Sequence, residues 1–272
     1  MTHLDESPDL QRRFGGLERL YGVEGAANIR SAHVAVVGIG GVGSWAAEAL
    51  ARSGVGEITL IDLDHIAESN INRQVHALDA TVGQAKVTAM HERIAQINPA
   101  CVVHEVDEFA SPDNWPAILQ SSTSRGVTAV IDACDDVKTK TAIAAWALQT
   151  KSLFIACGAA GGKRLAHLVD VDDIARTTHD PLLAQVRYRL RKFHGAPKEG
   201  KPIGVACVFS REAVAPPDPS CNIDGTGDDS GDGSLNCHGY GSVVSVTATF
   251  GQCAAGWVLD SVARRTLAVA KL

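Results

Sequence analysis

A glycine-rich run at residues 38–43 carries the clearest chemical signal in the sequence. It fits the pattern G-x-G-x-x-G with one additional glycine, and it joins a β-branched apolar run to an alanine-rich stretch. Such a turn at the start of a helix presents backbone N–H groups to phosphate. Asp62 ends the next apolar run, nineteen residues after Gly43, where a carboxylate binds a ribose hydroxyl. We therefore predict a nucleotide site at Gly38, Gly40, Gly41, Gly43 and Asp62, a pattern that both NAD and ATP satisfy.

The residues after Asp62 favour ATP over NAD. Asp64 follows closely, residues 69–74 read Ser-Asn-Ile-Asn-Arg-Gln, and Lys86 opens a predicted helix. Adenylation requires cations, because negative charge develops at the α-phosphate as pyrophosphate leaves. Further ATP contacts are therefore expected at Arg73 and Lys86. Asp64, Asn70 and Gln74 are expected to join them because of the resemblance described next. An NAD(P)-dependent oxidoreductase leaves these residues unexplained, and their presence disfavours a catalytically silent scaffold.

Together with Asp132 at the end of a later apolar run, these residues resemble the ATP-binding pattern of the ubiquitin-activating-enzyme superfamily. The resemblance runs from about Arg13 to Asp136 and includes the adenylyltransferases that activate ubiquitin-like sulfur carriers. It implies that Asp62 holds the ribose and that Asn70, Arg73 and Lys86 handle the phosphates. It also implies that Asp132 lies near Mg²⁺. Arg13 would reach the ATP of a partner subunit, which implies a homodimer, and the implied catalytic residues are Arg13, Arg73, Lys86 and Asp132.

The C-terminal half departs from the sulfur-carrier activators, which hold zinc with two C-x-x-C pairs that this sequence lacks. It resembles the tRNA threonylcarbamoyladenosine dehydratases instead, at residues 13–22, 180–192 and 208–210. This likeness implies an AMP-forming, ligase-type cyclase that uses ATP to dehydrate N6-threonylcarbamoyladenosine in tRNA to its cyclic form. Activation of a sulfur-carrier protein is the alternative. The sequence leaves open a monovalent cation (Na⁺ or K⁺) and a cysteine desulfurase or other sulfur-acceptor partner.

A basic segment suits a tRNA partner. Residues 176–201 contain seven Lys/Arg and two acids, a local charge of +5 in a chain whose net charge is −6. On the helix predicted at 181–194, like charges four residues apart destabilise the helix unless an anion offsets them. A phosphate backbone is such an anion. We therefore predict tRNA contacts at Arg187, Arg189, Arg191 and Lys192.

Alternating strands and helices must position these residues. Strands are predicted at 33–38, 57–62, 101–106, 127–132, 152–157, 165–171 and 203–209, and helices at 44–52, 83–97, 138–149 and 181–194. This rhythm predicts an α/β fold with a Rossmann-like, doubly wound, mostly parallel sheet and a C-terminal extension, as in the ubiquitin-activating enzymes. The predicted organisation is an N-terminal helical arm (1–30), an ATP-binding core (31–164) and a part that binds tRNA and forms the dimer (165–272). That last part includes a flexible loop at about 215–241, whose acidic stretch lacks the glutamate of a calcium loop.

Composition sets the compartment that we expect. Hydrophobic residues make up 45% and charged residues 21% of the 272, which is typical of a globular chain. The seven cysteines are never spaced C-x-x-C and the first residues lack a signal-peptide pattern, so we expect reduced thiols and a cytoplasmic protein. The uncharged, apolar segment 242–259 is predicted to be a buried terminal helix. Membrane association through that segment is the minor alternative.

Overall fold

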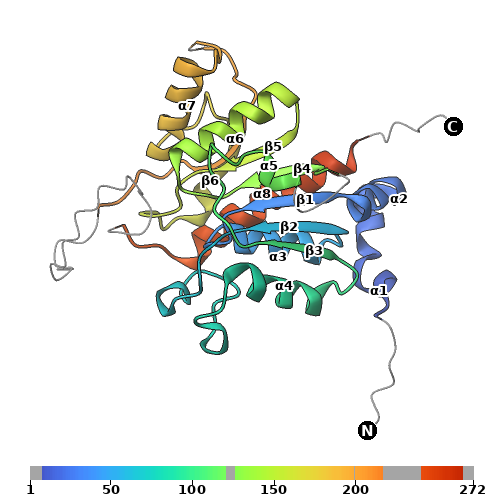
Figure 1. The fold of residues 1–272 in the computed structure, drawn as a ribbon. Helices are drawn as coiled ribbons and strands as arrows, with labels where there is room; N and C mark the ends of the chain where they lie inside the picture. The colour runs from blue at the N-terminus through green and yellow to red at the C-terminus, as the bar shows by residue number, and fades with distance from the viewer. Residues whose placement is uncertain (1–7, 121–125, 199, 217–239, 266–272) are drawn as a thin grey trace, which may run out of the picture.

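The computed structural model describes residues 8–120, 126–198, 200–216 and 240–265, and they form an α/β fold around one seven-stranded sheet (Figure 1). The strand order is β3-β2-β1-β4-β5-β7-β6, and β6 is antiparallel to β7 while the remaining pairs are parallel. The predicted doubly wound, mostly parallel fold is confirmed. The strands are β1 (His33–Val37), β2 (Glu57–Ile61), β3 (Val102–Val106), β4 (Ala129–Asp132), β5 (Leu153–Cys157), β6 (Val169–Asp173) and β7 (Ala206–Ser210).

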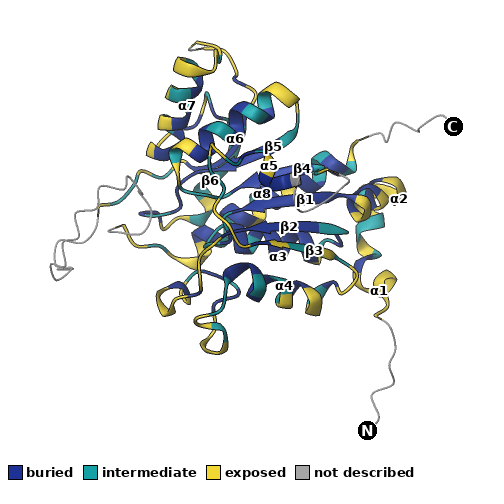
Figure 2. Ribbon diagram, viewed as in Figure 1, coloured by how far each residue is buried: buried dark blue, intermediate teal, exposed yellow. Residues whose placement is uncertain are grey.

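Helices cover both faces of the sheet, so the central strands are buried and mostly apolar. All five residues of β1 and all four of β4 are buried, and Figure 2 shows this dark centre beneath the exposed outer turns of the helices. One core lies beneath α2 (Gly16–Ser31), α3 (Gly43–Arg52), α4 (Lys86–Ile97) and α8 (Val244–Ala263). The other lies beneath α5 (Ala117–Gln120), α6 (Val137–Thr150) and α7 (Pro181–Phe193). Remaining helical elements are α1 (Leu10–Phe14), η1 (Glu68–Asn70), η2 (Asp79–Thr81) and η3 (Ala166–Leu168).

Two predicted strands are displaced, for an identifiable reason. The strand expected at 165–171 begins only at Val169, after η3, because its position follows from antiparallel pairing of Val169 with Ser210. The strand expected at 203–209 begins at Ala206 instead. The backbone N–H groups of Ile203 and Gly204 donate to the Asp173 carboxylate, at 3.0 and 2.6 Å, and not to a neighbouring strand.

The C-terminal third of the chain belongs to the same sheet and the same helical layers. It supplies β6 and β7 to the common sheet and α8 to the layer that also contains α3, so segments far apart in the sequence lie side by side (Figure 1). The predicted division at residues 164 and 165 stays a prediction. Most of the predicted loop at 215–241, namely residues 217–239, lies outside the described residues. The segment 242–259 largely forms the buried helix α8, and the described helices include none long and apolar enough to cross a membrane.

Gly251 lets α8 approach α3 closely, and this contact can be tested by substitution. A Cβ atom there would lie 2.5 Å from the Val42 carbonyl oxygen and 2.8 Å from the Ala46 nitrogen. We expect Gly251→Ala to lower the free energy of unfolding by about 1–3 kcal/mol, because the two helices must separate. Gly256→Ala, on the exposed side of the same helix with open space around it, should raise that free energy by up to about 1 kcal/mol. Urea denaturation of both variants measures the difference, and equal stabilisation by the two alanines would contradict the close contact.

Candidate active site

The predicted nucleotide residues gather at the carboxyl ends of β1, β2 and β4. β2 and β4 flank β1 on opposite sides, so the connections from β1 and β4 diverge to opposite faces of the sheet. Ligands bind in the crevice at such a switch point in open α/β sheets. Local sequence therefore builds each motif, and the strand order brings the motifs together.

The glycine turn is constrained at both of its ends. Gly38 has a φ of +84°, and a Cβ atom there would lie 3.0 Å from the Ala133 carbonyl group. At Gly43, a Cβ atom would lie 1.8 Å from the Gly38 carbonyl oxygen. Any side chain at Gly43 would thus open the turn and displace the start of α3.

The first turn of α3 is available to an anion. Its N-cap residue, Val42, makes no side-chain capping hydrogen bond, and the N-terminal end of a helix carries partial positive charge. A Cβ atom at Gly40 would have open space around it, whereas one at Gly41 would lie 3.3 Å from Cγ of Arg73. The turn therefore leaves space beside Gly40 and has an arginine side chain against Gly41.

Asp62 ties the turn to the second strand. Its carboxylate accepts the backbone N–H of Ile39 at 2.6 Å and that of Asp64 at 2.8 Å. Lys86, itself buried, places Nζ 3.9 Å from Asp62 and 2.6 Å from the Asp64 carboxylate. Burial raises the pKa of Asp62, and the nearby Lys86 charge opposes that shift. One ion-paired cluster thus joins two predicted ATP contacts to the predicted catalytic lysine.

The segment after β2 holds the other predicted phosphate residues. Asn70 is buried and caps η1, because its side-chain oxygen accepts the Ala67 N–H at 3.1 Å. Arg73 Nη1 donates to the Ser69 carbonyl and to the Asn72 side chain, at 2.7 and 2.9 Å. Gln74 is buried, and its Oε1 atom has no hydrogen-bond partner among the described residues.

Asp132 forms a buried ion pair that the sequence did not predict. Both Asp132 and Lys140 are fully buried, with Lys140 Nζ 3.0 Å from Oδ2 of Asp132 and 3.1 Å from its backbone carbonyl oxygen. Burial lowers the pKa of Lys140, but the Asp132 carboxylate raises it, and the net shift is upward. The only sequence signal was the presence of Lys140, with Lys138, at the start of the mostly apolar helix predicted at 138–149. Asp132 is therefore neutralised from within the protein.

Arg13 lies near the amino-terminal ends of the strands, whereas the glycine turn of its own chain lies at their carboxyl ends. Its Nη1 atom donates to the carbonyl oxygen of Ile97, the last residue of α4, at 2.7 Å. A cavity of about 460 Å³ surrounds it, with Arg52 and Arg93 also in the lining. Both of those arginines bond to the buried carboxylate of Glu48. Three arginines around one carboxylate leave this cavity positively charged, and Arg13 has no access to the ATP motif of the same chain.

The predicted tRNA residues on α7 are not equivalent. Arg187 Nη1 donates to the carbonyl oxygens of Ile174 and Thr177 and to the Thr177 hydroxyl, at 2.9–3.1 Å. Arg191 donates to the Pro197 carbonyl at 3.1 Å. These carbonyl oxygens therefore offset part of the repulsion between the arginines. The sequence had suggested that an external anion would do so. Arg187 has a structural role that spacing alone did not indicate.

Exposed aromatic rings accompany the remaining cations of α7. Tyr188 and Phe193 are 59% and 60% exposed, and the Lys192 ammonium lies 5.4 and 5.1 Å from their ring centres. Sequence reasoning missed this pair, although the alternation of Arg, Tyr and Phe was visible. Aromatic rings beside cations suit unpaired bases as well as phosphates.

A second cavity, of about 350 Å³, opens at the start of α7 and is lined by residues that include Thr177, His179 and Arg187. His179 has a φ of +56°, and Lys163, nearly fully buried, donates to its carbonyl oxygen at 3.0 Å. Asp180 caps α7 and also accepts the Ala159 N–H, just beyond β5, at 2.9 Å. This cavity therefore lies at the carboxyl ends of the strands, as the glycine turn does.

Comparison with known proteins gives consistent results. A model of the ThiF family matches residues 12–271. The tRNA threonylcarbamoyladenosine dehydratase of Escherichia coli (strain K12) is 46% identical over 246 residues, covering 89% of this chain and 90% of that protein. Crystal structures of the E. coli tRNA N6-threonylcarbamoyladenosine dehydratase with AMP and with ATP are similar at TM-scores of 0.82 and 0.80. Both are 43% identical to this chain, and each comparison covers 95% of this chain and 97% of that one.

His76, behind Lys86, makes folding stability depend on pH. It is buried, both ring nitrogens lack a partner among the described residues, and burial with the Lys86 and Arg93 charges lowers its pKa to about 4. The unfolded chain takes up this proton near pH 6.5, whereas the folded chain resists it until about pH 4. We therefore expect His76 to remove roughly 3 kcal/mol of stability as the pH falls through that window.

Urea denaturation between pH 7 and 4 compares the wild type with His76→Leu, which should lose that much less stability. His91→Gln is the matched control, since His91 is partly exposed and paired with Glu105. An identical pH dependence in His76→Leu and the wild type would contradict the assignment.

Proposed function

Because the chain belongs to the ThiF family and, within it, to the tRNA threonylcarbamoyladenosine dehydratases, we propose that it uses ATP to cyclise N6-threonylcarbamoyladenosine in tRNA. It is an ATP-dependent enzyme whose product nucleoside is the substrate less one water. The observation that carries the proposal is the meeting of the glycine turn, Arg73 and Lys86 at the switch point of the sheet.

The site suits attack on the α-phosphate of ATP. The turn and the start of α3 bind the phosphates through backbone N–H groups, and the Asp62 carboxylate, which retains unused lone pairs, accepts a ribose hydroxyl. As the threonyl carboxylate attacks and pyrophosphate leaves, Arg73 and Lys86 stabilise the added negative charge. Lys86 is already held in place by Asp64, so little reorganisation is required.

The second half of the reaction needs no nucleophile from the protein. A carboxylate is a poor electrophile, and its acyl-adenylate carries AMP as a good leaving group. A nitrogen or oxygen of the same nucleoside attacks the carbonyl carbon, the C–O bond to AMP breaks, and the ring closes. Two cysteines of this region, the buried Cys157 and the partly buried Cys134, support this route. Desolvation raises the pKa of both thiols and keeps them protonated.

The cavity at the start of α7 is where we place the modified nucleoside. β5 and β7 are the second and third neighbours of β1 in the sheet, so their ends lie about 10–14 Å from the glycine turn. The carbamoyl linker can span part of this distance and carry the threonyl carboxylate toward the α-phosphate. The cations and exposed rings of α7, next to that cavity, then bind the tRNA around the nucleoside.

A homodimer explains the position of Arg13. This residue cannot serve its own glycine turn, and it lies in a positively charged cavity that suits the triphosphate of a second copy. Nearby α2 leaves Leu20 and Val23 more than 70% exposed, which suits burial against a partner. We therefore propose that Arg13 completes the site of the other subunit.

The arrangement around Asp132 does not suit the Mg²⁺ ion expected there. Its carboxylate is chemically suitable, but it is fully buried and paired with Lys140. A monovalent cation, a sulfur-transfer partner and a cytoplasmic location stay predictions.

The function is tested directly with purified protein, ATP and tRNA that carries the modified nucleoside. We expect AMP and a nucleoside lighter by one water, detected by mass spectrometry. Lys86→Ala should lower kcat at least 100-fold while the Kd for ATP changes little, because its charge acts mainly as pyrophosphate leaves. Arg264→Ala, which removes an exposed charge at the end of α8, is the control. An unchanged nucleoside with the wild-type protein would refute the function, and full turnover by Lys86→Ala would refute its role.

Mixing inactive chains tests the shared site. A dimer of one Arg13→Ala chain and one Lys86→Ala chain contains one complete site, so an equilibrated mixture should regain roughly a quarter of wild-type activity. Asp132→Ala is unsuited to this test, because it leaves Lys140 buried without its partner. No recovery after verified subunit exchange would contradict the dimeric site.

Binding of tRNA to α7 is tested with variants that spare the structural arginine. Arg189→Ala combined with Lys192→Ala should weaken binding to different tRNAs alike and flatten the salt dependence by about one unit per lost phosphate contact. Arg264→Ala is again the control. Arg187→Ala should lower thermal stability as well, because it removes three internal hydrogen bonds. If the double variant keeps both affinity and salt slope, the tRNA footprint lies elsewhere.

A further inference from the structure

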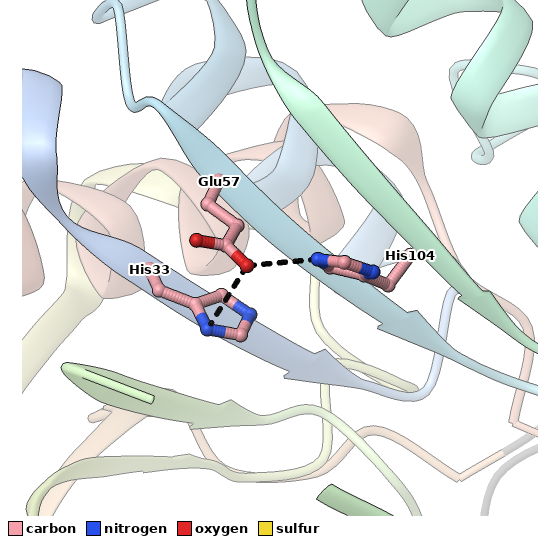
Figure 3. Close-up of side chains that lie close together, drawn as sticks. All are labelled: His33, Glu57 and His104. Carbon is pink, nitrogen blue, oxygen red and sulfur yellow. Dashed lines mark hydrogen bonds and ion pairs between the residues drawn. The ribbon is translucent and has the colours of Figure 1, made fainter. Parts of the chain in front are cut away.

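Three potential metal ligands meet on one face of the sheet, at the amino-terminal ends of β1 and β2. His33 and Glu57 are the first residues of β1 and β2 and are partners in the strand register. His104 of β3 is paired with Thr59, which lies on the same face of β2 as Glu57 because side chains alternate along a strand. Figure 3 shows the two imidazole rings on either side of the Glu57 carboxylate.

The spacing of these groups approaches that of a tetrahedral site. His33 Nδ1 and His104 Nε2 lie 3.7 and 2.8 Å from Oε1 of Glu57, and one ligand atom from each of the three residues lies within 4.8 Å of the others. The Gly126 carbonyl oxygen, 3.1 Å from His33 Nδ1, offers a fourth donor. Ligands bound to Zn²⁺ at 2.0–2.1 Å in a tetrahedron stand about 3.3 Å apart. The two distances to Glu57 differ from that value by about 0.4 and 0.5 Å, in opposite directions.

His33 can bind a metal through Nδ1 in only one of its two neutral tautomers. Burial lowers the pKa of His33, and Glu57 and the Gly126 carbonyl oppose that shift. Its Nε2 atom lies 2.8 Å from the Thr59 hydroxyl, which can either donate or accept. Without a metal, the Gly126 carbonyl oxygen accepts the Nδ1 hydrogen, because a carbonyl cannot donate. A metal at Nδ1 would require the proton on Nε2, which would then donate to Thr59. An outer hydrogen bond of this kind orients metal-binding histidines in general.

From this geometry we propose that His33, Glu57 and His104 form a Zn²⁺ site that joins the three strands β1, β2 and β3. Two imidazoles and one carboxylate favour Zn²⁺ over Mg²⁺ or Ca²⁺, which prefer all-oxygen sites. The site lies at the opposite end of these strands from the glycine turn. Its role is therefore to stabilise the sheet, and ATP binding does not depend on it.

Calorimetry and cobalt spectroscopy test the site on the full, tag-free chain after treatment with a chelator. We expect one Zn²⁺ per chain, a rise in Tm on adding it, and the visible absorption of tetrahedral Co²⁺ when Co²⁺ is added instead. His104→Gln removes a partly exposed ligand, and Glu57→Gln removes the carboxylate charge at nearly constant volume. Each should weaken Zn²⁺ binding roughly 100-fold or more and abolish the cobalt spectrum.

His91→Gln is the matched control, since it breaks a histidine–carboxylate pair with Glu105 outside the cluster. It should leave Zn²⁺ affinity and the cobalt spectrum unchanged. ATP binding, measured on every variant, should be retained and reports that the chain is folded. Absence of stoichiometric binding to the wild type, or binding that survives in folded His104→Gln, would overturn the proposal.

Discussion

The Asp62 carboxylate is the interaction on which the nucleotide site depends. It accepts the N–H of Ile39 from the glycine turn and that of Asp64 from the following segment, and it lies beside Lys86. A single buried group thus contacts the glycine turn, the segment after β2 and Lys86, the cation that we propose to act on the phosphates. The cost of burying this charge appears as a raised pKa, and the two backbone donors with Lys86 offset part of that cost.

A second buried charge is handled within the protein at the neighbouring strand. Asp132 at the end of β4 is neutralised by Lys140, and its other oxygen accepts the Cys134 N–H at 3.1 Å. The two buried charges neutralise each other, so the pair contributes no net charge at the end of β4. The phosphate chemistry that we propose for Arg73 and Lys86 therefore lies between the end of β2 and the start of α4, and not on β4.

The two ends of the sheet have different tasks. The glycine turn and the cavity beside α7 both lie at the carboxyl ends of the strands. This placement suits the proposed meeting of ATP and a nucleoside within one chain. At the amino-terminal ends lie Arg13 with its arginine-lined cavity and the His33–Glu57–His104 cluster. The length of the strands separates these features from the glycine turn of their own chain, and we propose that they act between subunits or on stability.

Local sequence determined the elements and the motifs, because hydrophobic periodicity and glycine chemistry act over short distances. The parallel sheet, the turn at residues 38–43 and the placement of Asp62 and Lys86 in one crevice could be predicted in this way. The contacts of several other charged side chains could not be assigned by residue type or spacing. Lys140, Arg187 and Arg191 are all cations on predicted helices, yet each is held by internal oxygens. Only the tertiary structure decided this, because a cation seeks whichever oxygen the fold brings near it, and those oxygens come from segments that sequence spacing does not relate.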